Sequence, residues 1–211
     1  SNYVPDCIVR ANATCSVEKL NSLHPETKNF TKKIVDAVAI ANCDISRGVT
    51  HNKGVMNGID AVAIATGNDF RAIEAGVHAY VSRSGKYQSL TKAKIIGNKF
   101  LYSIEIPLSI GTIGGVTDLH PLVKFALVLL GNPNSDDLMM IMASVGLAQN
   151  FGALRSLVTS GIQKGHMKMH LINLLNKLNA NENEKELAIE HFKNHKINNV
   201  SVKLFLKNIR K

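Results

Sequence analysis

One lysine, one aspartate and one histidine stand where their neighbours could make them reactive. Lys53 lies among asparagines and glycines in the stretch THNKGVMNGIDAVAIATGNDF, and Asp69 closes that stretch after an apolar run. A buried ammonium group keeps its charge beside a carboxylate, so Asp69 is the natural partner of Lys53. His166 follows a glycine, and a histidine there could act as a general acid on a mobile segment. These residue types indicate a Lys/Asp/His site.

The spacing of Lys53 and Asp69 makes a direct contact within one straight helix impossible. Their sixteen-residue separation (69 − 53) corresponds to roughly 24 Å at about 1.5 Å per residue. Either the chain bends back, or the lysine of one subunit meets the aspartate of another across a two-fold axis. We prefer the second arrangement, which predicts a homodimer.

Each of these residues also has a plainer interpretation. Lys53 can be a solvated residue at a helix start, and His166 can be a surface histidine. His166 and His170 have the spacing of a zinc-binding pair, but no glutamate stands between them and no third ligand is near. We therefore expect no metal site. Asn52 and Asn57 favour a functional site, because a buried amide must find partners.

The elements that position these residues follow from hydrophobic periodicity. Residues 6–18 alternate as a strand does, and residues 26–43 have the spacing of an amphipathic helix. Residues 55–66 are so apolar that a helix there would be buried on most faces. Asp69 is placed to cap a second helix that ends near Ser82.

The rest of the chain is mostly helical. AKIIGN and KFLYSIEIPL alternate around Gly97 and Asn98 and predict a hairpin. The loop SIGTIGGVT lacks the spacing of a nucleotide-binding loop, so we expect its glycines to pack tightly against substrate or core. The predicted fold is α+β, mainly helical, with a long buried central helix and a small antiparallel sheet. Further helices are predicted over residues 121–130, 136–159, 167–178, 184–195 and 199–209.

Composition narrows the class of protein. The chain has 211 residues, 45% hydrophobic content and a formal charge of +9. The basic residues are scattered and lack aromatic stacking partners, so we expect no nucleic-acid partner. No apolar run approaches the roughly 18 residues of a membrane span, so we expect no membrane association. Three widely spaced cysteines predict buried or free thiols in a reducing compartment, hence a cytoplasmic protein.

Two motifs carry a resemblance to a known family. HNKGVMNGIDAVAIATGND and GLAQNFGALRSLVTSGIQKGHM resemble the soluble, bacterial-type (class II) hydroxymethylglutaryl-coenzyme A reductases, from about Ser1 to about Leu178. The resemblance implies two-step reduction of 3-hydroxy-3-methylglutaryl-coenzyme A to mevalonate and coenzyme A with two NADPH or NADH, a step of isoprenoid biosynthesis. It also implies a homodimer whose active site lies at the subunit interface.

The resemblance gives the site residues roles. Lys53 would stabilise the oxyanion formed on hydride attack, Asp69 would hold that lysine, and His166 would protonate the departing thiolate. The same resemblance assigns substrate binding to Arg47, Asn57, Gln149 and Asn150, and it places Asn2 near the nicotinamide.

The resemblance also implies a domain division and an incomplete enzyme. Residues 1–20 would be a remnant of the small cofactor-binding domain, 21–164 part of the large substrate-binding domain, and 165–211 a C-terminal helical flap domain. The family's motifs EEPSVVAA, with a catalytic glutamate, and DAMGAN do not occur here, so we expect an inactive C-terminal half. The alternative is a non-catalytic module that binds an acyl-coenzyme A or another protein.

Overall fold

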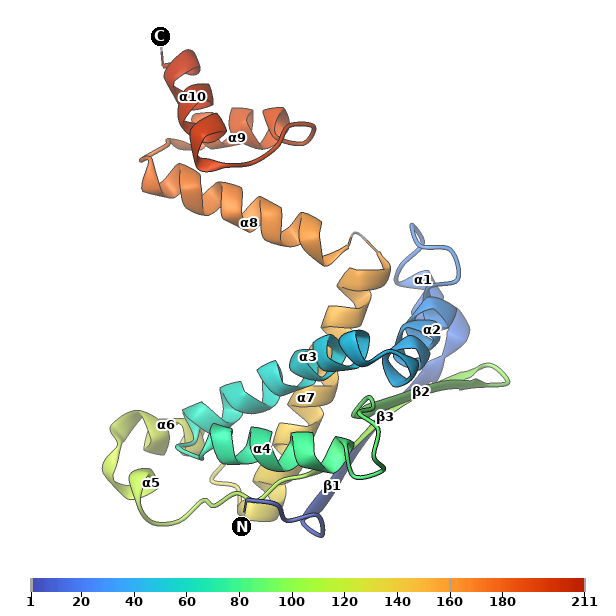
Figure 1. The fold of residues 1–211 in the computed structure, drawn as a ribbon. Coiled ribbons are helices and arrows are strands. Elements are labelled where there is room, and N and C mark those ends of the chain that lie inside the picture. Colours follow the sequence, from blue (N-terminus) through green and yellow to red (C-terminus); the bar gives the residue numbers. More distant parts are fainter. Residues whose placement is uncertain (1, 160, 211) are drawn as a thin grey trace. The chain divides into compact units, whose positions relative to one another are not determined.

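The chain divides into two compact units, Ser1–Thr159 and Ser160–Lys211. The computed structural model describes residues 2–159 and 161–210, apart from the side chains at positions 116, 118, 162–166 and 168. Figure 1 shows that helices predominate and that one small sheet lies in the first unit. The predicted α+β class is therefore confirmed.

The sheet of the first unit has three antiparallel strands in the order β1-β3-β2. They are β1 (Ile8–Ser16), β2 (Thr91–Ile96) and β3 (Lys99–Pro107). The turn between β2 and β3 contains Gly97, whose φ of 56° suits glycine, and the predicted hairpin is confirmed. Alternate residues of β3 from Phe100 to Ile106 are buried, so one face of the sheet packs on the core.

Residues 1–20 belong to the same unit as this sheet. They contribute β1 and then α1 (Val17–Ser22), and β1 pairs with β3 along its whole length. Their assignment to a cofactor-binding domain stays a prediction.

Helices surround the core of the first unit. Besides α1 they include α2 (Phe30–Cys43), α3 (Ile45–Ala65), α4 (Phe70–Val81) and α7 (Ser135–Val158). α3 packs against α2, α4 and α7, and α7 also packs against β1 and β3. α7 is long and apolar enough to cross a membrane, but its buried face here belongs to the core.

Helix α3 begins ten residues earlier than the predicted start at 55 (55 − 45). The side chain of Asp44 caps it by accepting a hydrogen bond from the Arg47 N–H at 2.7 Å. Gly58 lets α3 approach α7 closely, because a Cβ there would lie 2.8 Å from the Val145 carbonyl oxygen. Gly58 therefore serves the packing of the two helices.

The glycine-rich loop of residues 109–117 is open rather than packed. Within the described structure, nothing would lie within 4 Å of a Cβ on Gly111, Gly114 or Gly115, so the predicted tight packing against the core is wrong. Gly114 and Gly115 have φ angles of 81° and 57°, which explains why glycine stands there. The last two residues of this segment begin the short helix α5 (Val116–Leu119), and α6 (Pro121–Leu129) comes next.

In its described residues, 161–210, the second unit has three helices with a core of their own. They are α8 (Ile162–Lys177), α9 (Glu182–His191) and α10 (Asn199–Ile209). α8 begins five residues before the predicted 167 (167 − 162), whereas α10 spans the predicted residues. The core of this unit contains Leu171, Leu175, Ala188, Val202 and Leu206.

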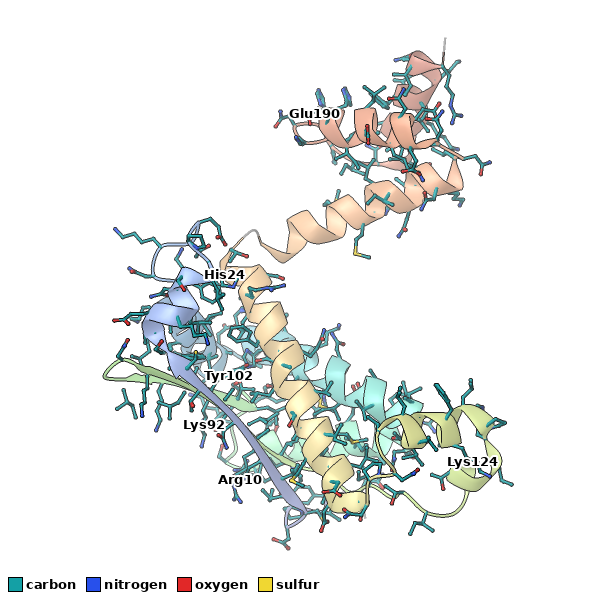
Figure 2. All side chains as sticks on the ribbon, turned by 180° about the vertical axis from the view of Figure 1, so that it is seen from behind. Arg10, His24, Lys92, Tyr102, Lys124 and Glu190 are labelled. Atoms are coloured by element: carbon teal, nitrogen blue, oxygen red, sulfur yellow. The ribbon has the colours of Figure 1, made fainter. Side chains whose placement is uncertain are left out.

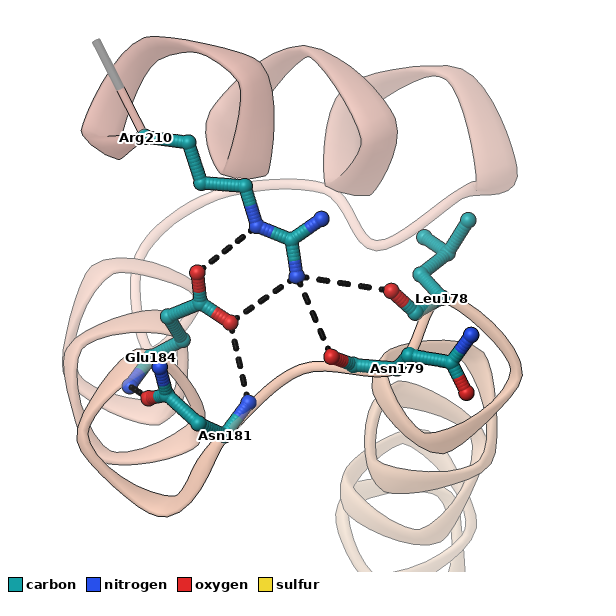
Figure 3. A network of polar contacts seen from close by, with 5 residues as sticks. All are labelled: Leu178, Asn179, Asn181, Glu184 and Arg210. Atoms are coloured by element: carbon teal, nitrogen blue, oxygen red, sulfur yellow. Dashed lines mark hydrogen bonds and ion pairs between the residues drawn. The ribbon is translucent and has the colours of Figure 1, made fainter.

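A polar network joins the three helices of the second unit (Figure 3). Arg210 donates hydrogen bonds from Nε and Nη2 to both carboxylate oxygens of Glu184, at 2.7 and 2.9 Å, and from Nη2 to the Leu178 and Asn179 carbonyls. Glu184 also accepts the Asn181 N–H, which completes a capping box for α9. The Arg210 guanidinium and this N–H lower the pKa of Glu184 to about 2.

Candidate functional site

Lys53 lies inside α3 and points to the surface. It is exposed, and its Nζ donates a hydrogen bond to Oδ1 of Asn57, one turn further along the helix, at 3.2 Å. The predicted position at the entrance of a helix is therefore wrong, because α3 starts eight residues earlier (53 − 45). Lys53 and Asn57 form a cation and amide pair on one exposed face of the helix.

Helix α7 brings the GLAQN segment beside this pair. The Cβ of Gln149, an exposed residue, would lie 2.9 Å from a Cβ at Gly58, the residue after Asn57. Nδ2 of Asn150 would lie 3.3 Å from a Cβ at Gly54, the residue after Lys53. The two motifs separated along the chain therefore meet where α3 and α7 touch.

Asn150 is buried and bonded to the core. Its Nδ2 donates to the His51 carbonyl oxygen at 2.9 Å, and its Oδ1 accepts from the Tyr102 hydroxyl and, at 3.4 Å, from Oγ1 of Thr91. Only 1% of Asn150 is exposed, and burial raises the pKa of the Tyr102 phenol. These contacts give Asn150 a positioning function between α3, α7 and the sheet, while direct contact with substrate stays a prediction.

His51 completes this buried network from α3. Its Nε2 lies 2.7 Å from Oγ1 of Thr91, and its Nδ1 has no partner within the described structure. Burial, helped by the charge of Arg47, lowers the pKa of His51 from 6.5 to about 4. His51 is therefore neutral at physiological pH, and it lies two residues before the exposed Lys53 and six before Asn57.

Asn52 is also structural. It is fully buried, its Nδ2 donates to the Gln88 carbonyl at 2.8 Å, and its Oδ1 accepts the Leu90 N–H at 2.8 Å. The interpretation that this amide marks a ligand site is wrong, because both of its polar atoms hold the segment before β2. Only Asn57 of the two asparagines faces outward.

A carboxyl pair between α3 and α4 was missed by the sequence analysis. Burial and the carboxylate of Glu74 raise the pKa of Asp60 to about 7, and Oδ1 of Asp60 has no hydrogen-bond partner within the described structure. Each acid looks like an ordinary helical surface residue by itself. Only the packing of α4 on α3 brings them together.

Asp69 caps α4, as predicted, and does not touch Lys53. Its Oδ1 accepts the N–H groups of Arg71 and Ala72 at 3.1 and 3.2 Å, and its side chain is 61% exposed. Asn68 beside it accepts the Gly111 N–H at 2.9 Å, which ties the glycine-rich loop to the end of α3. Among the described contacts, the partner of Lys53 is Asn57 rather than Asp69.

The remaining predicted residues lie apart from this pair. Arg47 is half-buried in the first turn of α3, and Asn2 is exposed, with its carbonyl oxygen 2.6 Å from where a Cβ of Gly76 on α4 would be. The side chain of His166 lies outside the described residues; its backbone is within α8. In the described part of the chain, no three of the His, Cys, Asp and Glu side chains are grouped as metal ligands.

The neutral buried His51 should make stability depend on pH. The unfolded chain protonates His51 near pH 6.5 and the folded chain only near pH 4, so its contribution is complete above pH 6.5 and falls as the pH drops toward 4. Between pH 7 and 5 this amounts to about 2 kcal/mol. The raised pKa of Asp60 acts with the opposite sign, because its cost disappears as the pH falls below 7.

The measurement must therefore isolate His51. Urea denaturation gives the free energy of unfolding of the unchanged chain and of His51→Gln at each pH. We expect the difference between the two to fall by about 2 kcal/mol when the pH is lowered from 7 to 5. His170→Gln, at an exposed position of α8, is the control and should leave the pH dependence unchanged. A difference that stays constant over this range contradicts the assignment.

The fold and the α3/α7 motif define a known class of protein. The family model described as hydroxymethylglutaryl-coenzyme A reductase matches residues 1–171. The chain therefore belongs to the hydroxymethylglutaryl-coenzyme A reductase family.

Individual relatives agree with this assignment. A 3-hydroxy-3-methylglutaryl-coenzyme A reductase of Archaeoglobus fulgidus is 47% identical over 163 residues, 74% of this chain and 36% of the relative. A probable reductase of Borreliella burgdorferi is 38% identical over 183 residues, 87% of this chain and 42% of the relative. The chain thus spans less than half the length of these curated relatives.

Solved structures of the Streptococcus pneumoniae reductase share the fold. One has a TM-score of 0.73 and 39% identity, covering 99% of this chain and 50% of that chain. Another, the class II enzyme bound to NADPH in open conformations, has a TM-score of 0.72 and 39% identity, covering 100% of this chain and 52% of that chain.

Proposed function

We propose that this chain supplies the substrate-binding half of an enzyme that reduces 3-hydroxy-3-methylglutaryl-coenzyme A to mevalonate and coenzyme A. The observation that carries the proposal is the exposed pair of Lys53 and Asn57, held where α3 meets the Gln149 region of α7, in a chain of the reductase family. The NADPH-bound relative supports a nicotinamide cofactor, which supplies the hydride.

The roles follow from what the side chains offer. Hydride addition to a thioester carbonyl places negative charge on oxygen, and an ammonium group fixed by Asn57 stabilises this charge more in the transition state than in the ground state. We assign this function to Lys53. His166 would give a proton to the departing thiolate, Arg47 and Gln149 would bind the acyl group, and Asn2 would lie near the nicotinamide.

We further propose that Asp69 reaches Lys53 from a second subunit. Two observations support this: within the described chain Asp69 makes only helix-cap hydrogen bonds and an ion pair with Arg71 at 3.8 Å, and 61% of its side chain is exposed. An exposed apolar face of α6 also favours association with a second subunit: its residues Leu122, Phe125 and Leu129 are 64–75% exposed.

The mass of the chain in solution, measured over a range of concentrations, tests the dimer. We expect light scattering after size-exclusion chromatography to give twice the mass of 23.0 kDa at micromolar concentration, and Phe125→Glu to give the monomer. Lys124→Glu, a neighbouring charge change on α6, is the control and should remain dimeric. A chain that is monomeric at every concentration contradicts the interface.

The chain by itself should be inactive, since the motifs EEPSVVAA and DAMGAN do not occur in it. We expect no decay of NADPH absorbance with hydroxymethylglutaryl-coenzyme A for the chain alone. Fused behind the N-terminal half of the Archaeoglobus fulgidus relative, it should oxidise two NADPH per substrate. A folded fusion without oxidation rejects the reductase function.

The alternative is a module that binds an acyl-coenzyme A without redox chemistry. The exposure of both Lys53 and Asp69, with no contact between them in the described chain, favours it. The same fusion separates the two functions, because a binding module would retain coenzyme A by calorimetry and oxidise no cofactor. The free thiols of Cys7, Cys15 and Cys43, two of them exposed, support a reducing compartment such as the cytoplasm.

A further inference from the structure

A pocket with a largely charged rim lies where the sheet meets the end of α4. It has a volume of about 260 Å³. Its strand residues Arg10, Lys92, Ser103 and Glu105 alternate with buried ones, and the core residues Val81, Leu90 and Ile104 also line it. Lys53, Asn57 and Asp69 do not line it, so it is separate from the proposed catalytic residues. Its charged side chains and two of its hydroxyl groups come from the three strands, the end of α4 and the turn after it: Arg10, Tyr80, Arg83, Lys92, Ser103 and Glu105.

The pocket carries an excess of positive charge. Arg10, Arg83 and Lys92 contribute three cations against the single carboxylate of Glu105, a formal balance of +2 (3 − 1). Figure 2 labels Arg10 on β1 and Lys92 on β2, which enter the pocket from strands on either side of β3. The net charge of the whole chain, +9, adds to the attraction for anions.

Glu105 is the one carboxylate in the described lining, and each of its oxygens already accepts a hydrogen bond. Oε2 accepts Nε–H of Arg10 at 2.9 Å, and Oε1 accepts the hydroxyl of Tyr80 at 2.7 Å. These two hydrogen bonds lower the pKa of Glu105, so the carboxylate stays charged and holds Arg10 in place.

Among the described residues, Arg83 and Lys92 have no carboxylate in ion-pair contact, although the charge of Lys92 helps to lower the pKa of Glu105. None of the ion pairs among the described residues includes either of them. Arg83 is nevertheless fixed: its Cζ lies 3.6 Å from the centroid of the Tyr80 ring, and its Nη1 donates to the Tyr80 carbonyl at 2.8 Å. A guanidinium held in this way loses little freedom when it binds a second acceptor.

We propose that this pocket binds a small anion through a phosphate group. A planar guanidinium fork and a lysine point charge suit phosphate, and Ser103 adds a hydroxyl donor. The volume lies below the 300–1,000 Å³ or so of pockets for drug-sized ligands, which limits the ligand to free phosphate or a short phosphate ester. The proposal stands whether or not the chain takes part in reduction.

The test is a titration of the whole ¹⁵N-labelled chain with inorganic phosphate, with sodium chloride lowered to keep the ionic strength constant. We expect saturable shifts of the amide signals near Arg83, Lys92 and Ser103. Arg83→Gln and Lys92→Gln should each weaken binding about tenfold, the loss of one charge-assisted contact. A parallel titration with glycerol 3-phosphate compares the affinity for a phosphate ester with that for free phosphate. The ligand that binds more tightly indicates which of the two the pocket takes.

The control is Lys94→Gln, which removes the same charge from the same strand two residues from Lys92 but does not line the pocket. It should change phosphate affinity less than twofold. Shifts that do not saturate overturn the proposal. So does an equal loss of affinity in Lys94→Gln and Lys92→Gln, because general surface charge would then explain the binding.

Discussion

Replacing Asn150 with leucine should lower the free energy of unfolding by about 3 kcal/mol, because buried polar groups lose their partners. The amide of Asn150 accepts from Tyr102 and Thr91 and donates to the carbonyl of His51, and leucine can do neither. Each buried group left unsatisfied costs about 1–3 kcal/mol. Urea denaturation at pH 7, followed by circular dichroism, measures the change.

Gln149→Leu is the matched control for this prediction. It makes the same kind of change one residue earlier on α7, at an exposed position, so it should alter stability by less than about 0.5 kcal/mol. If Asn150→Leu is as stable as Gln149→Leu, the buried network does not hold α3, α7 and the sheet together. In the reductase fusion, Gln149→Leu should instead raise KM, which separates a binding residue from a positioning one.

Local sequence chemistry predicted the elements whose signals lie within a few residues. The hairpin follows from alternation on both sides of Gly97, and the cap of α4 follows from Asp69 before an apolar run. The start of α3 did not follow, because Gly48 and Gly54 stand in its first ten residues, and each glycine costs a helix roughly 1 kcal/mol. Packing reverses that argument, since a Cβ at Gly48 would lie 2.8 Å from the Ala41 carbonyl oxygen, and one at Gly54 would lie 3.3 Å from Nδ2 of Asn150.

The site was predictable in its residue types but not in its contacts. The motif around Lys53 identified the family, and the family model matched. The side chain of Asn150 donates to the carbonyl oxygen of His51, which is 99 residues away in the sequence, and no periodicity connects two such positions. Asn52 and Asn57 were both expected to mark a functional site, yet the packing of α3 buries the first and exposes the second.

Lys53→Ala should reduce kcat of the reductase fusion by about 10²–10³-fold, the usual effect of removing one group that stabilises an oxyanion. Lys53 is exposed and contacts Asn57 at the surface of α3, so the substitution leaves the buried face of the helix intact. Stability should therefore change little, and the unfolding midpoint in urea checks this. The rate is measured as NADPH absorbance decay at saturating substrate.

Lys99→Ala provides the control, because Lys99 is an exposed lysine at the start of β3 and lies in neither proposed site. Its activity should equal that of the unchanged fusion. The activity of Asn57→Ala should lie between those of Lys53→Ala and Lys99→Ala. This substitution removes the acceptor at 3.2 Å that orients the ammonium group of Lys53 but leaves the charge in place. If Lys53→Ala turns over as fast as Lys99→Ala, the cation on α3 does not act on the thioester, and the binding module becomes the better account of this chain.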